Sequence, residues 1–204
     1  MIPILLLSSL SLLGPAPQAY AKEGVARVTV LTASPQLHEV VVDFAGQKLS
    51  LDYSVASRDV EVKGGTTEFS ATAGDAKLDQ KIHFAPGEAY LVVLTGDKED
   101  LQAKVLSAHW TGDQAHLMVF PACEMKGCQL RVDGKTSGHE KEGIHELSLP
   151  AGKHTVALLH GDKVLVSRDV DLKVDHCYQM VALGQDPSSM RMVMVTQARP
   201  ALHG

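Results

Sequence analysis

Residues 86–96 read Pro86-Gly87-Glu88-Ala89-Tyr90-Leu91-Val92-Val93-Leu94-Thr95-Gly96, and residues 174–184 read Val174-Asp175-His176-Cys177-Tyr178-Gln179-Met180-Val181-Ala182-Leu183-Gly184. In both stretches a turn precedes a tyrosine, an apolar run and a closing glycine, at an offset of 88 residues. An offset within a few residues of 88 also matches 27–30 with 116–119 and 40–46 with 130–134. A repeat of this length indicates a duplicated domain rather than a solenoid, because each copy holds enough strands to close its own core.

The rest of the first copy consists of short alternating or β-branched runs, separated by clusters of Gly, Pro, Asp and Ser. No window of eleven residues carries the apolar stripe of an amphipathic helix. The seven runs lie at 26–31, 39–44, 59–62, 67–71, 77–83, 90–94 and 103–108. This pattern predicts an all-β fold of two tandem Ig-like antiparallel β-sandwich domains. We place the first sandwich at 22–109, a linker at 110–115, and the second sandwich with a C-terminal tail at 116–204.

The first 21 residues predict a signal peptide that is removed on export. They contain no charged side chain, and their apolar run over 4–13 is too short to span a bilayer. Ala19-Tyr20-Ala21 then supplies the small-x-small pattern that precedes a cleavage site. An uncleaved hydrophobic tail is the alternative, because no Lys or Arg precedes the apolar run. No later window approaches the roughly 20 apolar residues of a transmembrane helix, so we expect no transmembrane segment in the mature chain.

The charge balance argues against two classes of partner. The chain has 24 acidic and 19 basic residues, a net charge of −5, and both signs are spread along it. Binding to nucleic acid or to an anionic membrane surface favours concentrated Lys and Arg instead. We therefore expect no nucleic-acid partner, and a protein or a component of the cell envelope is the expected one.

Signatures of the common enzyme classes are absent from the sequence. It has no Gly-x-Ser-x-Gly elbow, no Gly-rich phosphate loop and no His-Glu-x-x-His. Its carboxylates are scattered over positions typical of polar faces and turns. The sequence therefore predicts a protein that is not an enzyme and that needs no cofactor.

Parts of both copies resemble known bacterial domains. The stretches 27–35, 40–43 and 86–93 resemble the bacterial envelope family catalogued as domain of unknown function 4397, over nearly the whole first copy. In the second copy, Val132-Asp133-Gly134 and 149–156 are similar to that family and to the PEGA domains of surface-layer proteins. The resemblance implies an Ig-like sandwich in an exported bacterial protein, periplasmic or extracellular, and it supplies no catalytic residue.

Two positions of the first copy depart from that family. Thr32 stands where the family often has His, and Ala45 breaks its usual Asp-Gly turn.

The three cysteines, Cys123, Cys128 and Cys177, all belong to the second copy, and export would place them in an oxidising compartment. If the strands alternate in direction, the loop after the first strand and the loop before the sixth lie at the same end, and any pairing is possible. We favour a Cys123–Cys128 bridge because Gly127 makes the short insert flexible, and Cys128–Cys177 is the alternative. The remaining thiol would form mixed disulfides or be buried as a small apolar group.

The same end could also hold a metal. Cys123, Cys128, His176 and Cys177 would make a Cys₃His set suited to zinc. Their spacing matches no common zinc motif, and oxidation competes with metal binding.

Met190, Met192 and Met194, here called the Met row, lie on one face of the last strand by period-2 geometry. The offset of 88 makes their equivalents Gln102, Lys104 and Leu106, so this face could be partly solvated. The row is then a core face, a soft surface for a partner, or a thioether site for Cu(I).

Trp110, the only tryptophan, falls at the join between the copies. We expect it to pack between the two sandwiches, with an exposed binding aromatic as the alternative. Together these features predict a non-catalytic, exported cell-envelope or secreted β-sandwich module with a binding or structural role. The alternative function is extracytoplasmic handling of copper or zinc, through the Met row or the Cys/His end.

The predicted processing gives a direct test. Protein recovered from outside the cytoplasm should begin at Lys22, because signal peptidase cleaves after the small-x-small pattern. Intact mass and N-terminal sequencing check this, and a mature protein that keeps residues 1–21 would contradict export by this route.

Overall fold

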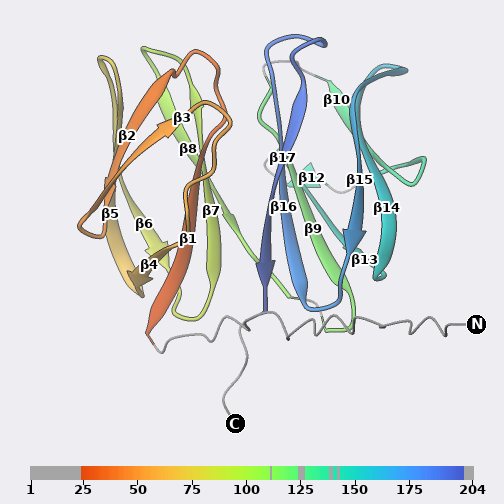
Figure 1. The fold of residues 1–204 in the computed structure, drawn as a ribbon, viewed down its shortest axis with the longest axis horizontal. Helices are drawn as coiled ribbons and strands as arrows, with labels where there is room; N and C mark the ends of the chain where they lie inside the picture. The colour runs from red at the N-terminus through yellow and green to blue at the C-terminus, as the bar shows by residue number, and fades with distance from the viewer. Residues whose placement is uncertain (1–23, 111, 124–126, 138–139, 142, 200–204) are drawn as a thin grey trace, which may run out of the picture.

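The computed structural model describes residues 24–110, 112–123, 127–137, 140–141 and 143–199 of the 204-residue chain. The described residues form two β-sandwiches that lie side by side, as predicted, and none of these residues is in a helix (Figure 1). A membrane-spanning helix is accordingly not found in this part of the chain. The predicted signal peptide, residues 1–21, lies outside the described residues.

The first sandwich has two four-stranded sheets. Its inner sheet, which faces the second sandwich, has strand order β4-β1-β7-β8, and its outer sheet has order β3-β2-β5-β6. The strands are β1 (Val25–Thr32), β2 (Glu39–Phe44), β3 (Gln47–Asp52), β4 (Val60–Lys63), β5 (Gly65–Ala73), β6 (Ala76–Phe84), β7 (Ala89–Gly96) and β8 (Leu101–Ser107). All seven predicted runs are strands. β3 was not predicted, because this edge strand exposes most of its side chains and carries little apolar pattern.

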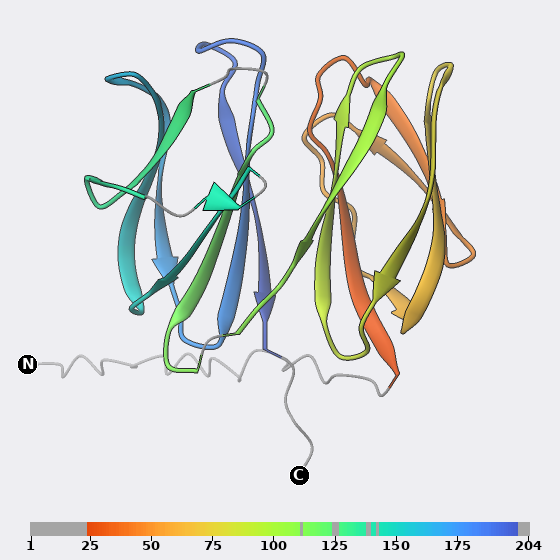
Figure 2. The ribbon, with the colours of Figure 1, turned by 180° about the vertical axis from the view of Figure 1, so that it is seen from behind.

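The second sandwich repeats this strand order. Its inner sheet has order β12-β13-β9-β16-β17, and its outer sheet has order β11-β10-β14-β15. The strands are β9 (Ala115–Pro121), β10 (Cys128–Val132), β11 (Lys135–Thr136), β12 (Glu140–Lys141), β13 (Ile144–Leu149), β14 (Gly152–His160), β15 (Lys163–Leu172), β16 (His176–Leu183) and β17 (Arg191–Ala198). Figure 2 shows β8 leading from the first sandwich toward the second.

Each inner sheet has a parallel pair of strands at its centre. β1 pairs with β7 so that Val28 is level with Tyr90, and β9 pairs with β16 so that Leu117 is level with Tyr178. The other pairings of these strands, with β4 and β8 and with β13 and β17, are antiparallel. The shared register shows that the two copies have the same fold.

Each sandwich closes its own apolar core by alternating inward and outward side chains. In β5, Phe69, Ala71 and Ala73 belong to the core, while the residues between them are only partly buried. Phe69 packs against Phe44 of β2 with ring centroids 5.5 Å apart. The second core is built in the same way around residues such as Leu158 of β14.

A third apolar layer lies between the two inner sheets. β7 buries every residue from 89 to 94, because alternate side chains face its own core and the second sandwich. Leu91 and Val93 of β7 belong to the same cluster as Val181 and Leu183 of β16. Strands that are buried on both faces give continuous apolar runs rather than alternating ones. This two-sided burial explains why 86–96 and 174–184 are the most apolar strands of their copies.

Polar and aromatic contacts also connect the two sandwiches. The buried Gln179 donates from Nε2 to the carbonyl oxygen of Leu106 at 2.9 Å. The guanidinium of Arg191 lies over the ring of Tyr53, 4.4 Å from its centroid. Trp110 packs against the shared layer, as expected for a residue at the join. The two sandwiches therefore form a single packed body.

A tyrosine hydroxyl closes the same corner in both sandwiches. Tyr90 Oη accepts from the N–H of Ala85 at 2.8 Å, and Tyr178 Oη accepts from the N–H of Lys173 at 2.8 Å. At each corner the chain leaves the outer sheet and enters the inner sheet. The bond therefore ties the two layers together, in the manner of the tyrosine corner of Ig-like folds.

Removal of either hydroxyl should destabilise the protein measurably. Tyr90→Phe and Tyr178→Phe are each expected to lower the free energy of unfolding by about 1–2 kcal/mol, because a backbone N–H loses its acceptor while the ring still packs. Urea denaturation followed by circular dichroism measures the change. Tyr53→Phe is the control, since its ring contacts Arg191 instead. Corner variants as stable as that control would contradict the assignment.

Candidate functional site

The structure separates Cys177 from the other two cysteines. Cys177 lies on β16 level with His116 at the start of β9, whereas Cys123 follows the end of β9 at Pro121. The prediction that all three cysteines share one end is therefore wrong. The cause is the missed edge strand of the hairpin, which is β3 in the first copy and β11 in the second. It adds one reversal of the chain, so that β9 and β16 run parallel.

Cys123 and Cys128 do lie together. Their Sγ atoms are 3.8 Å apart, and the structure records both residues as thiols. Cys177 is fully buried in the layer between the sandwiches, and burial raises the pKa of its thiol to about 12. This placement excludes a Cys128–Cys177 bridge and makes Cys177 the buried third thiol.

The four residues considered for zinc are not brought together. Cys123 and Cys128 lie at one end of the second sandwich, and His176 and Cys177 lie at the opposite end. His176 stacks on Tyr178. In the described ranges, no group of three or more His, Cys, Asp and Glu side chains is arranged to hold a metal.

The Met row belongs to the core of the second sandwich. Met192 is 8% exposed, and Met190 and Met194 pack against the same cluster. The connection from β16 to β17 is one residue longer than that from β7 to β8, so the offset in the last strand is 89. The equivalents in the first sandwich are therefore Leu101, Ala103 and Val105, not Gln102, Lys104 and Leu106. A one-residue slip moves every side chain of a strand to its other face, so the structure supports the core interpretation of the Met row and not a partly solvated face.

A hollow of about 820 Å³ lies on the outer sheet of the first sandwich, where the sequence analysis placed no site. It is bounded by the β2–β3 turn, Ala45-Gly46, and by one edge of β5. β2 ends at Phe44, level with Phe69, so in the described part of the chain β5 continues through 65–68 without a partner strand on that side. We call this place the β5 hollow. Its only signal in the sequence is the departure from Asp-Gly at Ala45.

The lining of the β5 hollow combines apolar and charged groups. Phe44 and Phe69 lie beneath it, and its charged residues are one lysine, Lys81, and three acids, Asp43, Glu68 and Asp79. Glu68 and Lys81 are level on the neighbouring strands β5 and β6. The hollow therefore offers both signs of charge beside the unpaired edge of a strand.

In the second sandwich, side chains narrow the equivalent place. Its hollow is about 400 Å³ and lies beside the β10–β11 turn, Asp133-Gly134. Asp133 Oδ1 accepts from the N–H of Thr155 at 2.9 Å, and the N–H of Asp133 donates to the carbonyl oxygen of Thr155 at 3.0 Å. The turn is thereby bonded to the part of β14 that continues past the end of β10.

His154 completes this closure. Its Nδ1 lies 2.7 Å from Asp133 Oδ2, and its Nε2 lies 2.9 Å from the carbonyl oxygen of Pro150. Both partners only accept hydrogen bonds, so the ring satisfies them together when both nitrogens carry a proton. The hydrogen bond to Asp133 accordingly raises the pKa of His154, and bonds from Thr155 and His154 lower the pKa of Asp133. With both nitrogens engaged, this histidine is not available as a general base.

Ala45 is the residue that leaves the β5 hollow open. It occupies the position of Asp133 in an equivalent turn, with a φ of 51° against 50°. The left-handed conformation costs alanine about 1 kcal/mol, and its methyl group cannot accept a hydrogen bond. The backbone bond that Asp133 makes to β14 has no counterpart at Ala45 in the described first sandwich. Thr67 stands where the second sandwich has His154.

No protein-family model matches the chain, and no curated protein matches it. Among solved structures, a "putative cell adhesion protein" from Bacteroides uniformis matches with a TM-score of 0.29 at 7% identity, over 84% of this chain and 98% of its own. Another from Bacteroides ovatus matches with a TM-score of 0.30 at 7% identity, over 90% and 99%. Matches with TM-scores this low assign neither a family nor a function.

The Asp133–His154 pair should stabilise the second sandwich within a pH window. Because the pKa of His154 is raised in the folded protein, its contribution to the free energy of unfolding is complete below about pH 6.5 and is lost as the pH rises through the folded-state pKa. Because the pKa of Asp133 is lowered, its contribution is present above about pH 4 and is lost as the pH falls through the folded-state pKa.

His154→Gln should therefore destabilise the protein by about 0.5 kcal/mol more at about pH 5.5 than at about pH 8.5, a modest figure because Asp133 is 48% exposed. Urea denaturation at the two pH values measures the difference. His83→Gln is the matched control, since that ring lies near the hydroxyl of Thr66 instead of a carboxylate. An equal loss at both pH values would show that the ring is not held as an imidazolium.

Proposed function

We propose that this chain is a non-catalytic, exported binding module of the cell envelope or the secreted fraction, and that the β5 hollow is its contact surface. The observation that carries the proposal is the contrast between the two copies. In the second sandwich Asp133 and His154 bond across this position and its hollow is about 400 Å³, whereas the first sandwich has Ala45 and Thr67 there and a hollow of about 820 Å³. Export rests on the signal peptide expected at the N-terminus.

The chemistry of the hollow supports a polypeptide partner. The edge of β5 over 65–68 presents backbone N–H and C=O groups to which an extended segment can bond by strand addition. Glu68 and Lys81 offer one charge of each sign for side chains of that segment.

The packing of the molecule supports the same role. The β5 hollow lies on an outer sheet, and the inner sheet of the same sandwich is fixed against the second sandwich by a buried layer. A rigid surface loses little conformational entropy when it binds, so more of the contact energy appears as affinity.

The two copies provide the variant that tests this proposal. Ala45→Asp with Thr67→His installs in the first sandwich the residues that close the second, and Asp tolerates the left-handed turn better than Ala. Immobilised wild-type protein should retain an envelope partner from a detergent extract of the producing cells, and the closing variant should retain it about tenfold less. Quantitative mass spectrometry of the retained proteins measures the difference.

Ser167→His is the matched control for this experiment. It places the same side chain at an exposed position on β15 of the second sandwich, away from the β5 hollow. The control should retain the partner as wild type does. Equal retention by all three proteins, with the closing variant folded by circular dichroism, would rule out the β5 hollow as the contact surface.

A further inference from the structure

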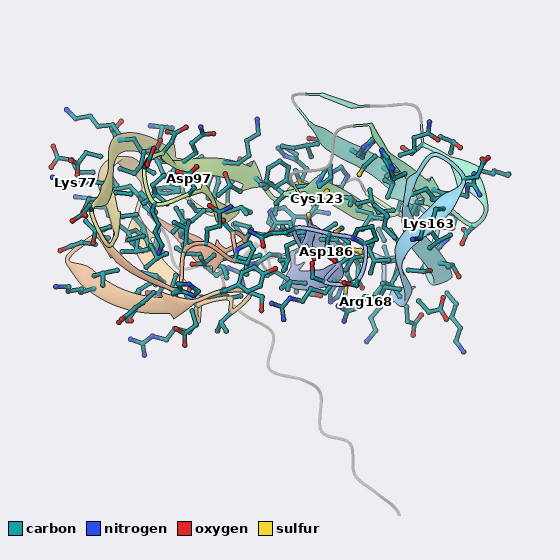
Figure 3. The ribbon with its side chains drawn as sticks, turned by 90° about the horizontal axis from the view of Figure 1, so that it is seen from above. Lys77, Asp97, Cys123, Lys163, Arg168 and Asp186 are labelled. Carbon is teal, nitrogen blue, oxygen red and sulfur yellow. The ribbon has the colours of Figure 1, made fainter. Side chains whose placement is uncertain are left out.

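The cysteine pair lies at a meeting point of three sheets. Cys123 follows β9 of the inner sheet and Cys128 begins β10 of the outer sheet, so their 3.8 Å Sγ contact joins the two layers of the second sandwich. Cys123 also lines a groove of about 290 Å³ whose other wall, with Pro35 and Asp97, comes from the first sandwich. Figure 3 shows Cys123 between Asp97 of the first sandwich and Lys163 of the second.

The pair differs from the third cysteine in access. Cys123 and Cys128 are both partly exposed, whereas Cys177 is fully buried near the opposite end of the sandwich. A reagent that enters from the groove therefore meets Cys123 and does not meet Cys177.

We infer that Cys123 and Cys128 form a dithiol–disulfide exchange site, which reacts through the groove with an external disulfide. In the first step, the thiolate of Cys123 attacks one sulfur of the external disulfide, forms a mixed disulfide and releases one thiolate. In the second step, the sulfur of Cys128 attacks Cys123, closes the internal bridge and releases the second thiolate. The pair gives up two protons and two electrons, and the external disulfide is reduced to two thiols.

The surroundings set the order of the two steps. Burial and the neighbouring Cys123 raise the pKa of Cys128 to about 11, so Cys128 keeps its proton near neutral pH. Since the thiolate is the nucleophile, the first attack falls to Cys123, which also lines the groove. Cys128 then acts as the resolving thiol at a distance of 3.8 Å.

The test uses the full mature chain, reduced and freed of reductant, with the aromatic disulfide dithionitrobenzoate as the probe. The folded protein should release two equivalents of thionitrobenzoate, lose two hydrogens in intact mass and yield a peptide that links Cys123 to Cys128. A third equivalent should appear only in denaturant, because Cys177 is buried.

Two variants separate the roles of the thiols. Cys128→Ser should release one equivalent and keep the probe bound at Cys123, whereas Cys177→Ser should behave as the wild type does in the folded state. A wild-type protein that keeps the probe at Cys123, or links Cys177 instead, would overturn the proposal. If Cys128→Ser does not fold, the mass of the wild-type product alone shows whether the probe stays at Cys123 or the Cys123–Cys128 bridge forms.

Discussion

Burial of β7 and β16 on both faces is the constraint on which the rest of the structure depends. Each strand supplies alternate side chains to its own core and to the layer shared by the sandwiches, as Tyr90 and Leu91 do in β7. Full burial of a Leu or Val stabilises by about 1.5–3 kcal/mol. Unsatisfied polar atoms at the layer, Gln179 Oε1 and Trp110 Nε1 among them, each cost about 1–3 kcal/mol. The many apolar side chains of the layer outweigh these costs, so the copies remain joined although each closes its own core.

The same constraint explains which parts of the fold could be predicted. Runs such as 89–94 and 177–183 are apolar at every position or nearly so, and their match revealed the duplication. β3 lies at a sheet edge with one fully buried side chain, so no apolar pattern marks it. The omitted edge strand of the hairpin adds one reversal of the chain, so its omission put Cys177 at the wrong end. One extra residue before β17 likewise put the Met row on the wrong face.

The candidate site could not be found from sequence for a different reason. The β5 hollow exists because β2 stops at Phe44 while β5 continues to Gly65, and this depends on pairing between strands that are distant in sequence. Ala45 was visible as a departure from Asp-Gly, but its meaning depends on what Asp133 does in the other copy. There the carboxylate bonds Thr155 and His154, which no local pattern predicts. The site was therefore identified by comparing the structures of the two copies at Ala45 and Asp133.

Ala45 also bears on why the two copies differ. Selection for stability alone would favour Asp at this turn, since Asp tolerates a φ near 50° and adds bonds to the adjacent strand. The second copy follows this rule at Asp133. The first copy carries instead a residue with a left-handed strain of about 1 kcal/mol and no capping group. Backbone strain that no local interaction offsets is typical of positions that contact another molecule. Under the proposed function, the second sandwich is the support and the first is the binding half of one packed molecule.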